Sequence, residues 1–414
     1  MRPAILMSGV CAVSALACTP AFAQGTVTLY GLLDAGVNYL SNAQTGRQDG
    51  KLEGGSKYSL EDGSTGGQNG SRWGLLGSEE LGGGWRAVFR LEGGFTINNG
   101  ALGQGGAEMG RQAYVGLASS YGTVTAGRQY DFIATRVGTL ASSTQWAGYI
   151  SGHASDVDNF LHTRRINNAI KYTSPDYRGL SLGAMYSFGG VAGSVGRQQI
   201  WSAGLGYANG PFTFGAAYLN ARNPNLSFYG SNPSAGTSVT SMNTGSLGSA
   251  TSPESNPAYA GYASASTLQV AAAGAAWRVG SITLGTTYSN VQFRGLGDTA
   301  TSGPNPFGYS GTATFNIGEV NLRWQLSPSL LVGTAYSYAH SGGADGRDSA
   351  IYQQGSLGAD YLLSKRTDIY SIVVYQHASG TDSLNQPAVA SISGQTASAN
   401  NHQLAVRFGL RHRF

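Results

Sequence analysis

The sequence is poor in charge and in cysteine, and it lacks long apolar runs. Asp, Glu, Lys and Arg make up 11% of the 414 residues, less than half of the roughly 25% found in soluble domains. Beyond the N-terminal region no stretch approaches about 18 consecutive apolar residues, which excludes a protein built from transmembrane helices. Disorder is also excluded, because the net charge is only +4 and 10% of the residues are aromatic.

The first 23 residues have the features of a secretory signal peptide. Arg2 gives a basic start, a short apolar stretch covers residues 4–17, and Ala-Phe-Ala at residues 21–23 has the small-x-small form of a cleavage site. We therefore expect a mature chain of residues 24–414. Both cysteines lie in the signal, so the mature protein has no disulfide and no thiol nucleophile. The alternative is a lipid anchor on Cys18, but in Ala15-Leu16-Ala17 the Leu is not at the position expected before such a cysteine.

Glycine and tyrosine are abundant, with 63 and 23 residues. So much glycine disfavours a helical bundle, because each helix-interior Gly costs about 1 kcal/mol. The mature chain instead alternates between apolar and small or polar side chains, as strands with two different faces do. The C-terminal segment shows this best, with Leu404, Val406, Phe408, Leu410 and Phe414 on one face and Ala405, Arg407, Gly409 and Arg411 on the other.

About sixteen segments share this alternation, and the connections between them differ in length. The predicted strands are 26–38, 70–78, 84–95, 111–119, 122–130, 167–174, 180–188, 197–207, 211–221, 267–277, 281–291, 313–325, 329–339, 350–362, 367–377 and 402–413. Tight turns alternate with long connections at 39–69, 96–110, 131–166, 222–266, 292–312 and 378–401, and with shorter ones at 189–196 and 340–349. A soluble sandwich is the alternative, but this fold does not require short connections to alternate with long ones.

These features predict an all-β protein, a transmembrane antiparallel β-barrel. In lipid every backbone N–H and C=O must be paired within the protein, and a closed sheet leaves no edge. About sixteen strands enclose a water-filled lumen, whereas eight would be filled by side chains.

Several motifs, taken together and in order, resemble the trimeric general porins of Gram-negative outer membranes, in particular the beta-proteobacterial kind. They are TLYGLLD at 28–34, SRWGLLGSEELGGG at 71–84, RQAYVGL at 111–117, GTVTAGRQYD at 122–131, RINNAIKY at 165–172 and the terminal Phe414. The resemblance implies a homotrimer in the cell outer membrane, surrounded by lipid and lipopolysaccharide, with short periplasmic turns and long extracellular loops. It also implies that the barrel-assembly machinery reads Val406, Phe408, Leu410 and Phe414 as an insertion signal.

The resemblance further implies that the third long loop, residues 131–166, folds into the pore and narrows it. Its acids are Asp131, Asp156 and Asp158. In the family a ladder of arginines on the wall faces this loop, and the matching residues here are Arg72, Arg111 and Arg165. All three stand at corresponding ends of predicted strands that run in the same direction, which places them at similar depth. Weaker pore-lining candidates are Arg90, Arg128 and Arg136; ordinary salt bridges on the wall or loop are the alternative for all six.

The expected function is passive diffusion of small hydrophilic solutes and ions, with weak anion preference because Arg dominates the basic residues. No cofactor, metal, catalytic residue or nucleic-acid partner is expected. The segment GLSLG at 179–183 matches a serine-hydrolase elbow, but it opens a strand rather than joining a strand to a helix. Two alternatives stay open: a substrate-specific channel, and an adhesin or receptor barrel whose loop 222–266, rich in Ser, Asn, Gly and Pro, forms an exposed surface.

Overall fold

A computed structural model describes residues 25–230, 240–344, 346 and 349–414. The predicted signal peptide, residues 1–23, lies outside the described residues. Within the described ranges, none of the helices has the length and hydrophobicity needed to traverse a bilayer.

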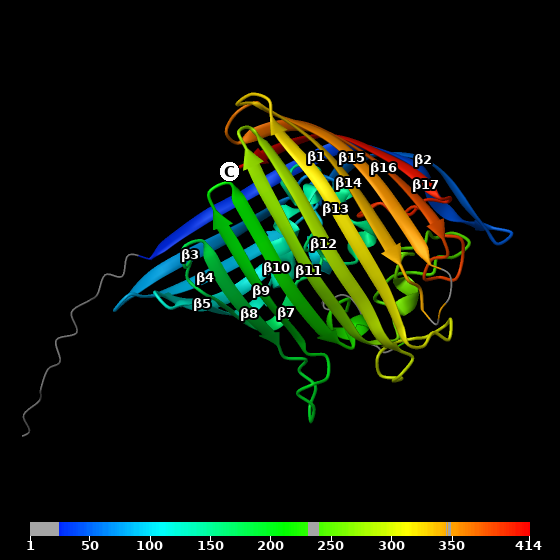
Figure 1. Cartoon of the computed structure of the whole chain (residues 1–414), viewed down its shortest axis with the longest axis horizontal. Coiled ribbons are helices and arrows are strands. Elements are labelled where there is room, and N and C mark those ends of the chain that lie inside the picture. Colours follow the sequence, from blue (N-terminus) through cyan, green and yellow to red (C-terminus); the bar gives the residue numbers. More distant parts are fainter. Residues whose placement is uncertain (1–24, 231–239, 345, 347–348) are drawn as a thin grey trace, which may run out of the picture.

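One closed antiparallel sheet forms the molecule (Figure 1). It has sixteen positions around the barrel, because β2 and β3 pair with successive parts of the same edge of β1. The strands are β1 (Thr26–Gln48), β2 (Lys51–Asp62), β3 (Arg72–Gly82), β4 (Trp85–Gly94), β5 (Gln112–Ser119), β6 (Gly122–Gln129), β7 (Ile166–Thr173), β8 (Leu180–Ser187), β9 (Ile200–Asn209), β10 (Phe212–Arg222), β11 (Ala265–Val279), β12 (Ile282–Leu296), β13 (Thr312–Gln325), β14 (Leu330–Ser341), β15 (Ala350–Leu362), β16 (Thr367–Gly380) and β17 (His402–Arg413).

Short helices and helical turns occupy the connections. They are η1 (Gly63–Thr65), α1 (Gly103–Gly106), η2 (Ile133–Val137), η3 (Gly138–Leu140), α2 (Ser142–Gln145), η4 (Tyr149–Ser151), η5 (Ala154–Asp156), α3 (Pro224–Ser227) and η6 (Ala260–Tyr262). Of the nine such elements in the described part of the chain, five lie between β6 and β7, within the third long connection.

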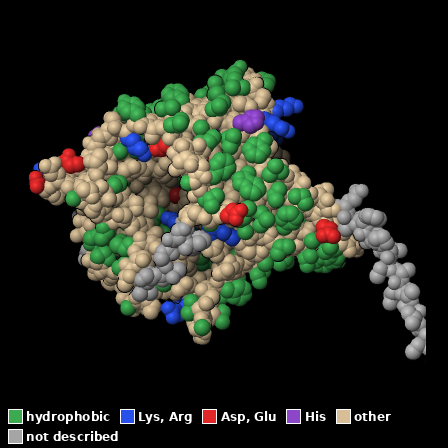
Figure 2. All heavy atoms as spheres, turned by 180° about the vertical axis from the view of Figure 1, so that it is seen from behind, with side chains coloured by type: hydrophobic (Ala, Val, Ile, Leu, Met, Phe, Trp, Pro, Cys, Tyr) green, Lys and Arg blue, Asp and Glu red, His purple; other side chains and the backbone are tan. Residues whose placement is uncertain are grey.

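The seam between β1 and β17 closes the barrel, and it shows why the chain alternates. Gly31 and Phe414 exchange two backbone hydrogen bonds of 3.1 and 3.0 Å at the end of this seam. In β17 the Phe408 side chain is 64% exposed on the outer wall, whereas Arg407 is fully buried inside. Figure 2 shows hydrophobic side chains spread over the outer wall and charged side chains in a hollow. The predicted two-faced strands are thus confirmed.

Tight turns join the strands at one end of the barrel, the turn end, and long connections join them at the other, the loop end (Figure 1). The prediction of a first long loop at 39–69 is wrong. Residues 39–48 continue β1, and β2 returns from residue 51, so the hairpin extends beyond the last β1–β17 pair at Leu40 and Ala405. Outside the region where one face meets lipid, its residues have no reason to alternate, so the pattern gave no strand signal.

The long connection at 223–264 is less exposed than its composition suggested. In its described parts, Phe228, Tyr229, Tyr259 and Tyr262 are all buried. They pack with one another and around Phe293 of β12, with ring centroids 5.2 to 6.3 Å apart. These parts of the connection therefore fold inward over the barrel wall.

Candidate functional site

Residues 131–165, called here the inner segment, cross the interior of the barrel. At the start, Phe132 and Arg136 lie against glycines of β8, β9 and β10; a methyl group at Gly204 would stand 2.7 Å from Phe132 Cβ. Further on, Trp146 lies against the opposite wall, where a methyl group at Gly333 of β14 would stand 2.4 Å from its ring. Glycine is needed at these wall positions because any side chain would occupy the space of the inner segment.

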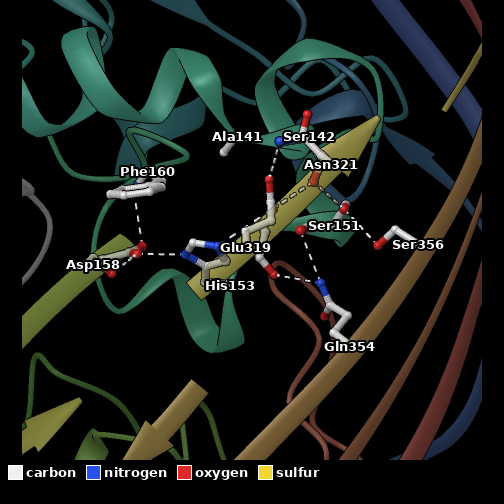
Figure 3. A network of polar contacts seen from close by, with 12 residues as sticks. Ala141, Ser142, Ser151, His153, Asp158, Phe160, Glu319, Asn321, Gln354 and Ser356 are labelled. Carbon is white, nitrogen blue, oxygen red and sulfur yellow. Dashed lines mark hydrogen bonds and ion pairs between the residues drawn. The ribbon is translucent and has the colours of Figure 1, made fainter. Parts of the chain in front are cut away.

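A buried polar network fixes the middle of the inner segment to β13 and β15 (Figure 3). Glu319 of β13 accepts hydrogen bonds from the Ser142 backbone N–H at 2.7 Å and from the Ser142 hydroxyl at 2.8 Å. Asn321 donates to the Leu140 carbonyl at 3.1 Å. On β15, Gln354 donates to the carbonyls of Ser151 and Gly152, both at 3.1 Å.

His153 stands between two acids in this network. Its Nδ1 is 2.7 Å from Asp158 Oδ2, and its Nε2 is 3.7 Å from Glu319 Oε2 (Figure 3). Burial alone would lower the pKa of His153, but Asp158 and Glu319 outweigh burial and raise this pKa to about 10. His153 is therefore a cation at neutral pH and joins an acid of the inner segment to an acid of the wall.

Arginines gather on the opposite side of the interior, at the loop end. A cavity of about 410 Å³ is lined by Arg111, Arg128, Arg164 and Arg165 together with Tyr149 and Thr163. Arg111 directly precedes β5 and Arg165 directly precedes β7, so the structure places these two predicted residues in one cavity. Of the weaker candidates, Arg128 of β6 lies in the same cavity, and it donates to the Gly110 carbonyl at 2.8 Å.

Glu92 of β4 binds the arginine cluster from the wall. Its carboxylate is 2.8 Å from Arg111 Nε, 3.0 Å from Arg90 Nη2 and 3.9 Å from Arg72 Nε. It also accepts a 2.7 Å hydrogen bond from the Tyr30 hydroxyl. Three of the six arginines singled out in the sequence thus share one carboxylate, which leaves an excess of positive charge.

The three acids of the inner segment have partners of their own. Asp131 accepts from the Ala134 N–H at 3.0 Å and from Asn159 at 2.8 Å. Asp156 accepts from the Leu161 N–H at 3.0 Å and from Thr163 at 2.5 Å, and Asp158 binds His153 and Ser289.

Burial and the neighbouring Asp158 raise the pKa of Asp156 to about 7. Asp156 is therefore partly protonated at neutral pH. Because these hydrogen bonds hold the acids within the inner segment and against β12, the acids balance the arginines less than their number suggests.

Comparisons with known proteins identify the family. A family model described as Gram-negative porin matches residues 10–381. The chain belongs to this family. It is accordingly a protein of the Gram-negative outer membrane.

Related sequences agree with this assignment. The chain is 36% identical over 221 residues to an outer membrane porin protein of Bordetella pertussis, covering 49% of this chain and 56% of the relative. It is 34% identical over 209 residues to outer membrane porin protein 32 of Delftia acidovorans, covering 47% and 53%. The chain thus matches about half the length of these relatives.

Solved structures show the same fold. An anion-selective porin from Comamonas acidovorans has a TM-score of 0.67 at 19% identity, covering 94% of this chain and all of that one. The trimer form of OmpT from Vibrio cholerae has a TM-score of 0.61 at 13% identity, covering 94% and 99%.

A second ionic cluster of this porin, whose pairing was not predicted from the sequence, lies on the inner wall at β15–β17 and β1. Arg407 donates to Asp34 at 3.1 Å and to Asn38 at 2.8 Å. Arg411 lies 3.0 Å from Asp368 and 3.2 Å from Asp360. The alternation in β17 places both arginines on the inner face, which is the feature of the sequence that predicts their position. Their acidic partners lie far away in the sequence and could not be predicted from it.

Proposed function

We propose that this porin forms a water-filled channel for passive diffusion of small hydrophilic solutes and ions, with a weak preference for anions. The observation that carries the proposal is the cavity lined by Arg111, Arg128, Arg164 and Arg165 beside the inner segment. Guanidinium groups stay charged over the whole relevant pH range. A lining of fixed positive charge raises the local concentration of anions and lowers that of cations.

The inner segment acts as the constriction of the channel. It crosses the interior from the β8–β10 wall to the β14–β15 wall, and the network around Glu319 and His153 holds it there. Solutes pass the remaining opening beside Arg72, Arg111 and Arg165. In this arrangement selectivity comes from width and charge, without a bound cofactor and without catalysis.

The orientation and assembly follow the family pattern. The turn end faces the periplasm and the loop end faces outside, where lipopolysaccharide surrounds the rim. Residues 1–23 direct export, and the barrel-assembly machinery reads Val406, Phe408, Leu410 and Phe414. The side chains of the last three are 46 to 64% exposed on the outer wall. Three copies assemble into a trimer, as supported by the likeness to the trimer form of a Vibrio cholerae porin.

Planar-bilayer recording of the purified protein tests the channel. In a KCl gradient the reversal potential should show a higher permeability for chloride than for potassium. Replacing Arg72, Arg111 and Arg165 together by Ala should reduce the chloride-to-potassium permeability ratio at least about two-fold, because the constriction loses three fixed charges.

The matched control removes three exposed cations at the loop end, Lys51, Arg222 and Arg294. This control should leave the permeability ratio unchanged. Equal effects of the two triple variants would mean that the proposed trio does not line the constriction. Cation preference of the unmodified channel would overturn the anion preference itself. Swelling of liposomes in sugars of graded size should show a smooth size limit; a single strongly favoured sugar would indicate a substrate-specific channel.

A further inference from the structure

A second pair of basic residues, Lys171 and Arg136, lies on the other side of the inner segment from the arginine cavity. Lys171 belongs to β7, and Arg136 belongs to η2 of the inner segment. Both side chains face the ring of Phe132: Lys171 Nζ is 4.5 Å and Arg136 Cζ is 5.9 Å from its centroid. Phe132 therefore brings two cations together through contacts with one buried ring.

The position of this pair along the barrel differs from that of the arginine cavity. Lys171 lies six residues after Arg165, about 20 Å further along the backbone toward the turn end. Its ammonium nevertheless donates to the Tyr130 carbonyl, and the Tyr130 hydroxyl accepts from Arg165. The Arg136 side chain extends along β9, where a methyl group at Gly206 would stand 3.1 Å from Arg136 Nη1. Gly206 pairs with Ser181, the second residue of β8, and with Gly215 near the start of β10. The Arg136 guanidinium thus lies near the turn end.

The two cations keep hydrogen-bonding capacity. Lys171 Nζ donates to the Tyr130 carbonyl at 2.8 Å, which uses one of its three protons. Arg136 Nε is buried and has no hydrogen-bond partner among the described residues. The Asp131 carboxylate interacts electrostatically with Lys171 and balances part of the charge of the pair, but among the described residues no ion pair within 4.0 Å involves Lys171 or Arg136. Both side chains are only partly buried.

We propose that Lys171 and Arg136 form a second anion-binding station, on the periplasmic side of the constriction, for small oxyanions such as sulfate, phosphate and carboxylates. A guanidinium offers paired donors to an oxyanion, and an ammonium adds a point charge. Anions that leave the arginine cavity meet this station before they reach the periplasm. The proposal rests on the proposed channel function and extends it, because it makes the field of the lumen positive on both sides of the inner segment.

Reversal potentials measured in both gradient directions test the proposal. Salt screens fixed charges, so the station affects ion selectivity most when the dilute solution fills the end of the channel nearest to the station. The variant Lys171→Gln/Arg136→Gln should therefore lower the chloride-to-potassium permeability ratio at least about two-fold with the dilute side at the turn end, and less with the gradient reversed. The mature chain has no cysteine, so Ser327→Cys in a tight turn, labelled from one side, reports the orientation of each channel.

The matched control removes two exposed cations from a turn at the same end, Lys365→Gln/Arg366→Gln. Sulfate added at the turn end should also reduce chloride current through the unmodified channel at lower concentrations than through the Lys171/Arg136 variant. An effect of the variant that is equal in both gradient directions, or equal to that of the control, would refute the station. If the unmodified protein opens no channel or prefers cations, the proposed function fails instead, so the two failures are distinguishable.

Discussion

Replacing His153 by Gln tests how the inner segment is held in place. His153 is 2% exposed, and it contacts Asp158 at 2.7 Å and Glu319 at 3.7 Å. Its pKa is raised from 6.5 to about 10, a difference that corresponds to roughly 5 kcal/mol in favour of the charged form. Gln preserves much of the volume and can donate one hydrogen bond, but it leaves two buried carboxylates without their cation.

Breaking a buried ion pair by removing one partner typically costs about 3–5 kcal/mol. The sixteen positions of the barrel wall do not depend on His153, so we expect this cost to appear as local detachment of the inner segment rather than as unfolding of the barrel. A cost of about 3 kcal/mol raises the detached population roughly 100-fold. Hydrogen exchange of the amides in residues 138–158 should accelerate by this factor, and open-channel current noise should increase.

The stabilisation of the inner segment by His153 should decrease as the pH rises. Because the pKa of His153 is raised in the folded protein, its stabilising contribution is complete below about 6.5 and is lost as the pH rises through about 10. The unmodified protein at pH 10.5 should therefore show the noise of the variant at pH 7. His402→Gln, at an exposed position, serves as the control. Unchanged exchange in the His153 variant, after correction for intrinsic rates, would refute the role of His153 as an anchor.

Two further substitutions probe the inner segment and its contact with the wall. Burial and Asp158 raise the pKa of Asp156 to about 7, so the folded protein favours the protonated carboxyl. The resulting stabilisation is complete below the unfolded pKa near 4 and is lost as the pH rises through 7. Asp156→Asn should therefore slow hydrogen exchange of residues 154–163 most at pH 8, less at pH 5.5 and little at pH 4; the opposite order would contradict the assignment. Gly333→Ala should displace Trp146 and destabilise the inner segment by about 1–3 kcal/mol. This displacement should shift the Trp fluorescence and the single-channel conductance. The control is Gly355→Ala, where no atom lies within 4 Å of the added methyl group; it should change neither the fluorescence nor the conductance.

The strands were predictable because each has one face toward lipid and one toward the lumen. In β15 and β17 the predicted ends, residues 350–362 and 402–413, coincide with the observed ones. The prediction failed at β2, where the hairpin with β1 extends past the neighbouring strands. Both of its faces meet the same kind of environment there, so burial imposes no period of two.

The candidate site was predictable only where a strand end fixes the position of a side chain. Arg111 and Arg165 precede β5 and β7, and strand direction alone brings them to one level. The orientation of Asp158 depends instead on Ser289 and on the His153–Glu319 contact, which join residues more than 130 positions apart. No local pattern encodes such contacts, so the partners of the acids in the inner segment could be found only from the structure.

The distribution of acids explains why the cavity can be strongly basic and still fold. Buried like charges destabilise one another, so a cluster of arginines needs at least one close carboxylate. Glu92 supplies it from the wall, with Arg111 at 2.8 Å and Arg72 at 3.9 Å. If the acids of the inner segment also faced the arginines, the lining would approach neutrality. The hydrogen bonds of these acids with backbone N–H groups and with His153 anchor the inner segment, while the opposite wall keeps its positive charge.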